Sequence, residues 1–263
     1  MKKTVVVTGA SSGIGRALAI AWGTRGARVV LCARDEGALA RVAEDVARAG
    51  GSAVVAAGNI TREPDRLRLI QVARDDSGRI DVFVNNAGRG YYGGLGTVDV
   101  DEVSALFALN VLAPLRLAQL AIDPLGRAGG TLVMVSSVAG VLASPHMGAY
   151  AASKFALEAI TAALRAELFG TGIRVLVVRP GPVDTPFRAR ALTSEGPAGV
   201  RPRGIAVQTA EDVASQIVRG VETGRSVIET TPFVRAASWV ARVTPALMNW
   251  VAAAMYARGA RER

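Results

Sequence analysis

Apolar residues along this chain occur mostly in short unbroken runs rather than in alternation with polar residues. Runs of this kind, bounded by turn-forming residues, are typical of strands that are buried on both faces. We predict seven such strands, at residues 3–8, 29–32, 53–56, 81–84, 131–136, 174–178 and 226–229. Strands buried on both faces indicate a parallel sheet that helices cover on each side.

Helical patterns fill the gaps between these runs, most clearly at residues 16–24, 36–49, 99–121 and 150–168. Another helix is predicted to begin at Thr209, because Thr209 and Asp212 have the spacing of a capping box. The regular alternation of strand and helix predicts an α/β fold. We expect a three-layer, doubly wound parallel sheet of the Rossmann type, with about seven strands and helices on both faces.

Composition agrees with one large core. Half of the 263 residues are hydrophobic and 29 are glycine, so we predict a single domain over residues 1–263. Cys32 is the only cysteine, which excludes an intramolecular disulfide and fits a reducing compartment. The first strand begins so early that it leaves no room for a secretory signal. We therefore predict a cytoplasmic protein.

Three glycines follow the first predicted strand and precede a helix, with the spacing G-x-x-x-G-x-G at Gly9, Gly13 and Gly15. A strand, a glycine turn and a helix start present free backbone N–H groups and the positive end of a helix dipole, which suit a pyrophosphate. Gly9 would permit the turn, Gly13 the approach of the phosphates, and Gly15 close packing of helix on strand. The alternative is a merely flexible turn.

A tyrosine and a lysine, Tyr150 and Lys154, lie four residues apart in a predicted helix and therefore on one helix face. Of the 31 basic residues 28 are arginines, and Lys154 is the only lysine outside the N-terminal pair. A nearby ammonium stabilises a phenolate and lowers its pKa, so that the tyrosine can exchange a proton with an alcohol or carbonyl oxygen. An ordinary aromatic residue beside a surface lysine is the alternative.

Taken together, these motifs and several others resemble the short-chain dehydrogenase/reductase family, specifically its compact single-domain members. The resemblance covers about residues 3–230. It rests on Thr8-Gly9-Ala10-Ser11-Ser12-Gly13-Ile14-Gly15, Asn85-Asn86-Ala87-Gly88, Asn110, Ser136-Ser137, Tyr150-Ala151-Ala152-Ser153-Lys154 and Arg179-Pro180-Gly181-Pro182-Val183-Asp184-Thr185-Pro186. No single motif is decisive, but the set in the family's order and separations is highly specific.

The resemblance implies reversible hydride transfer between a nicotinamide cofactor and a carbonyl or alcohol carbon. Tyr150 would be the general acid and base, and Lys154 would lower its pKa and bind the nicotinamide ribose. Ser137, thirteen residues before Tyr150 as in the family, would hold the substrate oxygen. Asn110 would support a proton relay to the lysine; a satisfied core asparagine is the alternative.

The same resemblance implies a set of cofactor contacts. Arg34 follows the second strand, where NAD-preferring relatives carry an acidic residue at about Ala33, so we predict NADP(H) rather than NAD(H). The family often has a further basic residue at the position of Ser12; this chain lacks it, which counts against NADP(H). The predicted contacts are Gly9, Ser11, Ser12, Gly13, Ile14, Gly15, Arg34, Asn59, Ile60, Asn86, Ala87, Gly88, Tyr150, Lys154, Pro180, Gly181, Val183 and Thr185.

Other chemistries have little support in the sequence. One histidine, His146, and one cysteine cannot make a conventional zinc site, and no nucleophile elbow accompanies the serines. The net charge of +9 favours an anionic cofactor or surface, but the arginines are scattered and no nucleic-acid recognition motif is visible. We predict no metal and no nucleic-acid partner. The most serious alternative function is an NADPH-binding sensor or scaffold without turnover.

Substrate and partners are less determined. We expect residues 186–208 to form a substrate lid and residues 232–263 a C-terminal helical extension. That extension holds 15 uncharged residues, 243–257, followed by arginines. It would pack at a subunit interface of a homo-oligomer or over the substrate pocket, with peripheral membrane contact as the alternative. A mostly apolar pocket for a lipophilic ketone or secondary alcohol would be lined by Tyr91, Tyr92, Leu142, Met147, Phe187 and Leu192.

Overall fold

A seven-stranded parallel sheet forms the centre of the protein in the computed structural model, which describes residues 2–74, 78–193, 206–244 and 246. The strand order is β3-β2-β1-β4-β6-β7-β9, and every neighbouring pair is parallel. The strands are β1 (Thr4–Thr8), β2 (Arg28–Cys32), β3 (Ser52–Val55), β4 (Val82–Asn85), β6 (Thr131–Val135), β7 (Arg174–Arg179) and β9 (Val227–Glu229). All seven predicted strands are confirmed, with no end displaced by more than one residue.

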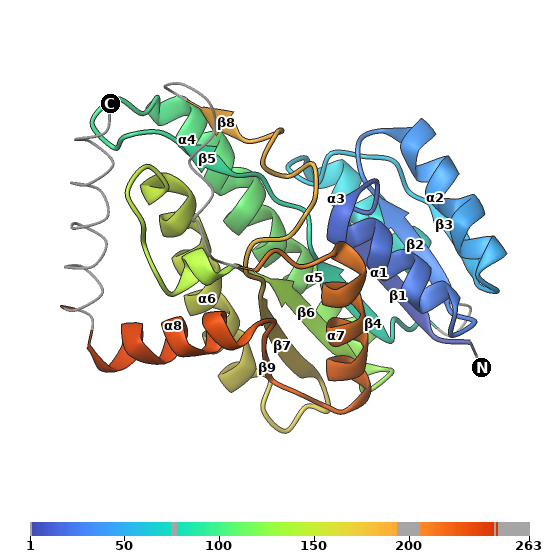
Figure 1. The fold of residues 1–263 in the computed structure, drawn as a ribbon. Coiled ribbons are helices and arrows are strands. Elements are labelled where there is room, and N and C mark those ends of the chain that lie inside the picture. Colours follow the sequence, from blue (N-terminus) through green and yellow to red (C-terminus); the bar gives the residue numbers. More distant parts are fainter. Residues whose placement is uncertain (1, 75–77, 194–205, 245, 247–263) are drawn as a thin grey trace.

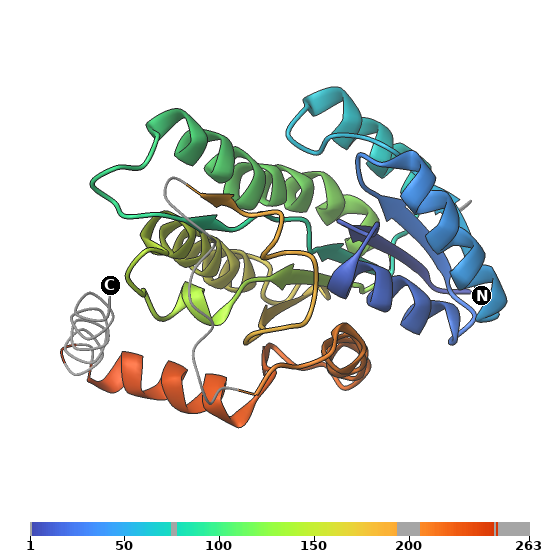
Figure 2. The same cartoon turned by 45° about the horizontal axis from the view of Figure 1, so that its top comes forward.

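Helices cover both faces of this sheet, so the predicted three-layer architecture is confirmed (Figures 1 and 2). One layer contains α1 (Gly13–Gly23), α2 (Glu36–Arg48) and α7 (Ala210–Glu222). The other contains α3 (Glu63–Ala73), α5 (Ala113–Gly126) and α6 (Gly148–Glu167). The predicted capping box begins α7, because the Thr209 hydroxyl accepts from the Asp212 amide and the Asp212 carboxylate from the Thr209 amide.

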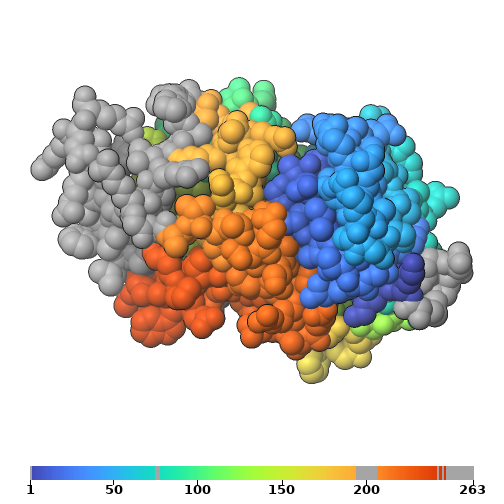
Figure 3. Space-filling model, turned by 45° about the vertical axis from the view of Figure 1, so that its right-hand side comes forward, coloured from blue at the N-terminus to red at the C-terminus, as the bar shows by residue number. Residues whose placement is uncertain are grey.

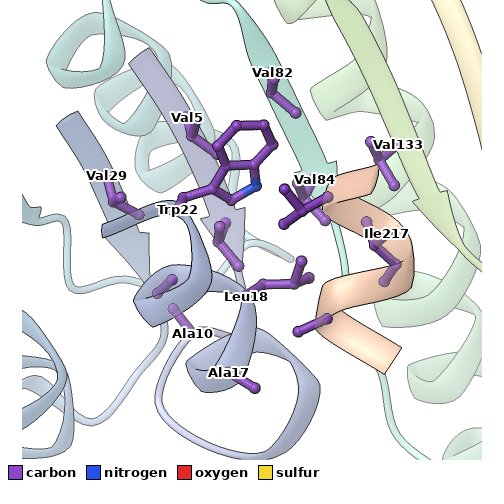
Figure 4. Packing of buried hydrophobic residues seen from close by; sticks show 14 of the residues in the cluster. Val5, Ala10, Ala17, Leu18, Trp22, Val29, Val82, Val84, Val133 and Ile217 are labelled. Atoms are coloured by element: carbon purple, nitrogen blue, oxygen red, sulfur yellow. The ribbon is translucent and has the colours of Figure 1, made fainter. Parts of the chain in front are cut away.

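Successive residues of each strand point to opposite layers, so an unbroken apolar run serves two cores at once. In β1, Val5 and Val7 belong to the cluster under α1 and α7, whereas Val6 belongs to the cluster under α5 and α6. Trp22 of α1 fills the first core and lies over Val5 and Val82 (Figure 4). Both cores therefore depend on the same short strands, which fixes the sheet edge at which the loops emerge.

The helix predicted at residues 99–121 is longer and less regular than expected. It consists of α4 (Val100–Phe107), one π-helical turn (Ala108–Leu112) and α5. Residues 100–126 are apolar and long enough to cross a membrane, but the residues that α5 buries pack against the sheet as a core helix does. The π turn carries Asn110, and such turns often mark functional sites.

Two smaller features flank the sheet. Strands β5 (Tyr91–Tyr92) and β8 (Leu192–Thr193) pair in parallel at the base of the predicted lid. Of that lid, residues 194–205 lie outside the described residues. Helix α8 (Pro232–Val243) begins the predicted C-terminal extension and exposes Phe233, Trp239 and Val243; residues 245 and 247–263 lie outside the described residues.

Candidate active site

The loops that carry the predicted site all emerge at the carboxyl edge of the sheet, where doubly wound folds bind ligands. The chain builds the sheet from β1 outward to β3 on one side and then from β4 outward to β9 on the other, so the strand order reverses between β1 and β4. The glycine loop follows β1, and the Asn85-Asn86-Ala87-Gly88 motif spans the end of β4. Sequence-distant motifs are therefore neighbours at one crevice.

Each glycine of the loop after β1 has its own steric reason. Gly9 has φ +67°, and an added Cβ would lie 2.9 Å from the Ala87 Cα. A Cβ on Gly15 would collide with the Gly9 carbonyl oxygen and lie 2.7 Å from the Asn86 Nδ2. Gly13 has φ +54° and would meet the Thr185 side chain at 3.0 Å. The turn and the close packing predicted for Gly9 and Gly15 are confirmed.

The N-terminus of α1 has the features of a phosphate site. Ser12 is its N-cap residue, but the Ser12 side chain makes no capping hydrogen bond and the first turn contains no acidic residue. The first N–H groups of a helix need acceptors, and the helix dipole favours an anion there. A cradle that only glycine permits, leading into an uncapped helix, fits the phosphates of a dinucleotide.

The Asn86 motif braces the glycine loop. The Asn86 Nδ2 donates to the carbonyl oxygen of Thr8 at 2.8 Å, and the amides of Asn86 and Ala87 both donate to the Thr8 hydroxyl, at 3.0 and 3.1 Å. The Asn86 amide side chain therefore holds β4 against the loop after β1. Thr8 begins the glycine motif quoted above, but its role as the partner of Asn86 was not predicted.

Tyr150 and Ser137 form the reactive core of the site. Tyr150 is on the first turn of α6, and Ser137 is the N-cap of the short helix Val138–Gly140 that follows β6. The Ser137 hydroxyl accepts a hydrogen bond from the Ala139 amide at 3.1 Å, which orients it, and the Ser137 side chain lies close enough to Tyr150 to affect the pKa of its phenol. The predicted choice of Ser137 over Ser136 agrees with this contact.

The pKa of Tyr150 differs from the expected direction. Burial raises the pKa of the Tyr150 phenol above its ordinary value, the Ser137 side chain acts to lower it, and the nearby Tyr92 adds to the increase. The Lys154 Nζ lies 5.9 Å from the ring centroid and donates to the Val135 carbonyl at 3.0 Å. The net direction is therefore opposite to the expected one in the protein alone, because the cost of desolvating a phenolate dominates; the effect of Lys154 on this pKa stays a prediction.

Lys154 is itself buried, and its environment weakens its charge. Burial lowers the pKa of Lys154 to about 8, while the carboxylate of Glu158 acts in the opposite direction. Tyr150, Lys154 and Glu158 succeed one another at four-residue intervals along α6. An acid or base and a titratable cation thus share one helix face, as in sites that transfer protons.

Asn110 links this helix to the loop after β4. Its Nδ2 donates to the Arg89 carbonyl at 2.9 Å and to the Ser153 Oγ at 3.0 Å, and its Oδ1 accepts the Arg89 amide at 2.9 Å. Ser153 in turn donates to the carbonyl oxygen of Tyr150 at 2.7 Å. Asn110 is thus a fully buried asparagine whose side-chain amide donates and accepts hydrogen bonds. One of its partners, Ser153, is bonded to the backbone of Tyr150.

Beneath Lys154 lies a buried ion network that the sequence did not indicate. Arg179, the last residue of β7, makes a bidentate pair with Glu158, at 3.0 and 2.8 Å, and a third bond of 3.0 Å to Glu229. The Arg179 side chain is only 5% exposed. The four-residue spacing of Lys154 and Glu158 could have placed both on one helix face. The arginine that pairs with Glu158 comes from a distant strand, so the sequence spacing does not reveal it.

The turn after β7 closes the site opposite the glycine loop. The Asp184 amide donates to the Gln208 carbonyl and the Gln208 amide donates to the Pro182 carbonyl, on either side of Val183, and Thr185 packs against Gly13. Pro180 and Gly181 lead into this turn, and the Gly181 amide donates to the Thr230 hydroxyl at 3.3 Å. Thr185 therefore lies beside the glycine loop, and the contacts of Val183 and Thr185 with the nicotinamide stay a prediction.

Residues predicted at the adenine side lie in three different environments. Arg34 is exposed directly after β2 and makes no hydrogen bond or ion pair with any other described residue. The Asn59 Oδ1 accepts from the amide and hydroxyl of Thr61, at 3.1 and 2.9 Å, which occupies its acceptor. Ile60 is 5% exposed and packs in the core under α3 and α5, which limits its surface for a ligand.

The predicted substrate pocket is assembled in part. Tyr91, Met147, Phe187 and Leu192 belong to one apolar cluster with Tyr150, whose ring centroid lies 5.8 Å from that of Phe187. Leu142 is partly exposed and lies outside this cluster. His146 has a strained φ of +60° in the same loop region. Within the described parts of the chain, no group of three potential metal ligands occurs.

Comparison with known proteins agrees with this geometry. The family model for short chain dehydrogenases matches residues 3–196. A dehydrogenase/reductase SDR family protein 7-like from Anopheles gambiae is 30% identical, over 95% of this chain and 81% of its own length.

Two solved structures are also similar. A short-chain dehydrogenase from Sphingobium yanoikuyae in complex with NADPH is 27% identical, with a TM-score of 0.78 over 99% of this chain and 95% of that one. A short chain dehydrogenase/reductase from Burkholderia phymatum in complex with NAD is 26% identical, with a TM-score of 0.80 over 91% and 92%. The chain described here therefore belongs to the short-chain dehydrogenase/reductase family of oxidoreductases.

Proposed function

We propose that this protein transfers a hydride reversibly between NADP(H) and the carbon of a ketone or secondary alcohol. The family membership supports an oxidoreductase with a nicotinamide cofactor, and similar structures bind NADPH or NAD. The single observation that carries the reaction is the closeness of the Ser137 side chain to the Tyr150 phenol, beside the glycine loop. This closeness supports a proton donor and an orienting hydroxyl that act on the same substrate oxygen.

Each residue then has a distinct task. Ser137 orients the substrate oxygen, and Tyr150 donates a proton to that oxygen during reduction and accepts it during oxidation. The bound nicotinamide supplies the hydride chemistry. Lys154 holds a positive charge near the phenol, and Asn110 positions α6 through Ser153 and the backbone of Arg89.

The phenol must become easier to ionise for this role. Because burial alone raises the pKa of Tyr150, the needed shift must come from groups that meet it in the loaded site. Lys154 supplies the charge within the chain, and its own lowered pKa of about 8 makes that charge sensitive to working pH.

NADP is preferred over NAD in this proposal because of Arg34. Arg34 is exposed after β2, and the preceding position, where NAD-preferring relatives carry an acidic residue, holds Ala33. A guanidinium binds a ribose 2′-phosphate through charge-assisted hydrogen bonds, whereas an acidic residue would bind the free ribose hydroxyls of NAD.

The substrate is proposed to be lipophilic, since the wall around Tyr150 is formed by aromatic and aliphatic side chains. We further propose a cytoplasmic homo-oligomer whose C-terminal segment packs at an interface. The exposed apolar side chains of α8 support such a contact, and a membrane surface is the other candidate for it.

Tyr150→Phe tests the reaction. We expect NADPH oxidation across a panel of ketones to fall by about 10²–10⁴-fold, since a general acid contributes about that factor. Fluorescence titration should show NADPH affinity within about twofold of the wild type, because the ring and its packing remain. A variant that keeps most of its rate would overturn the assignment of Tyr150.

The panel also tests the rival function. A sensor or scaffold would bind NADPH tightly and oxidise it with none of the carbonyl compounds. Assaying alcohols with both oxidised cofactors in parallel gives the reverse direction and the cofactor preference in the same experiment.

A further inference from the structure

An arginine from the segment after β7 lies at the glycine loop. The Arg190 Nη1 donates to the Ser12 Oγ at 3.1 Å, although 178 residues separate them. Both side chains are accessible to solvent, Arg190 more than Ser12. In Figure 3 the gold atoms of the segment that ends at residue 193 border the dark-blue atoms of the N-terminal part. A basic group from a distant segment therefore lies beside residue 12, whose own side chain is only a hydroxyl.

The position of this guanidinium is unfavourable for the protein alone. Ser12 is the N-cap of α1, and the N-terminal end of a helix carries a partial positive charge that repels cations. The first turn of α1 holds no acidic residue, and the Ser12 side chain does not cap it. A cation and a positive helix end that face one another without a carboxylate indicate a site for an anion.

The segment that carries Arg190 is fixed at several points. The Arg89 Nε donates to the Arg190 carbonyl at 3.0 Å, and the Leu192 amide donates to the Gly90 carbonyl at 3.0 Å. Phe187, on the same turn, lies against the ring of Tyr150. The Arg190 backbone is thus tied to the loop that Asn110 holds, so that its side chain is delivered to the glycine loop from the substrate side.

We propose that Arg190 binds a phosphate group of the dinucleotide and thereby closes the segment of residues 186–193 over the site. This inference rests on the proposed cofactor chemistry and adds a residue from outside the glycine loop to it. The anion would lie between the guanidinium of Arg190 and the N–H groups that begin α1. The same contact holds Phe187 against Tyr150, which couples cofactor binding to the wall of the substrate pocket.

Two phosphates of the cofactor have this chemistry, the 2′-phosphate and the pyrophosphate. Arg190→Met tests both by titration of the protein with NADPH and with NADH, read as cofactor fluorescence. We expect the Kd for NADPH to rise about tenfold, the loss of one charge-assisted hydrogen bond. A rise for NADPH alone identifies the 2′-phosphate, and an equal rise for both cofactors identifies the pyrophosphate.

Arg25→Met is the matched control. Arg25 lies just beyond the other end of α1 and pairs with Glu222, so the variant loses the same charge far from the glycine loop. Its Kd for both cofactors should stay within twofold of the wild type. Arg190→Lys should recover part of the affinity, and the difference between Arg190→Met and wild type should shrink as NaCl increases.

Unchanged affinity for both cofactors in Arg190→Met would overturn the inference. An equal loss in Arg25→Met would overturn it too, because the effect would then reflect net charge. Thermal unfolding without ligand should be the same in all variants, since Arg190 is exposed. If the wild type itself binds neither cofactor, the proposed function fails and the inference about Arg190 fails with it, whereas a loss of affinity confined to the Arg190 variants leaves the proposed function intact.

Discussion

The reactive end and the phosphate end of the crevice are built by different physical means. At the reactive end, Asn110, Ser153 and Lys154 are buried, and their polar atoms bind one another or backbone groups. At the phosphate end the position of the chain is set by glycines that leave no room for a Cβ, and the charged side chains Arg34 and Arg190 are exposed.

This contrast shows how one crevice can hold the proton-transfer residues at fixed positions and still let a cofactor enter and leave. Proton transfer needs atoms held at fixed positions, which buried and satisfied hydrogen bonds provide. A soluble dinucleotide must enter and leave, so its charged contacts remain accessible to water. We therefore expect changes at the reactive end to affect turnover and stability, and changes at the phosphate end to affect affinity.

Lys154→Met should have the largest effect. Turnover should fall by about 10²–10⁴-fold, since the cation that assists proton transfer is lost. The stability of the cofactor-free protein should also change its pH dependence. Lys154 has a pKa of about 8 when folded and 10.5 as a free side chain, so between these values the unfolded state binds more protons. The free energy of unfolding of the wild type, relative to the variant, should then rise with pH from about 8 to 10.5.

Urea unfolding of both proteins across this pH range measures that difference. Below pH 8 the two curves should run parallel, because the lysine is then protonated in both states. Parallel curves over the whole range would mean that Lys154 is not the titrating group, and the contrast would lose its electrostatic basis.

Arg179→Met tests the packing beneath the reactive end. It should lower the free energy of unfolding by about 3–5 kcal/mol, because the carboxylates of Glu158 and Glu229 would lose their buried cation. Chemical denaturation followed by circular dichroism measures this. Arg127→Met is the control: its pair with Asp123 has both side chains 55% exposed, and its removal should cost less than about 1 kcal/mol. Similar losses in the two variants would contradict the difference in burial.

Gly15→Ala should have the smallest of these effects and act at the other end. The added Cβ would press on the Gly9 carbonyl and on Asn86, so the loop must shift at a cost of about 1–3 kcal/mol. We expect NADPH affinity to fall about tenfold or more, with turnover at saturating cofactor little changed. Gly96→Ala, where an added Cβ meets nothing within 4 Å, should behave like the wild type in the same titration. A fall in turnover without a fall in affinity would reverse the division of roles.

The sequence predicted those parts of the fold that depend on neighbouring residues. The apolar runs identified all seven strands, and Thr209 with Asp212 identified the start of α7, because hydrophobic pattern and capping are local properties. The ion network of Arg179 and the contact of Arg190 with Ser12 could not be read in this way. Each joins segments that are far apart in the chain, and their spacing in the sequence carries no signal.

Sequence by itself determined the order of strands and helices, the glycine cradle and the spacing of Tyr150 from Ser137 and Lys154, since these follow from residue type and position along the chain. Only the tertiary structure decided the charge behaviour of the site. Burial raised the pKa of Tyr150 and lowered that of Lys154, because the cost of desolvating a charge depends on everything packed around it.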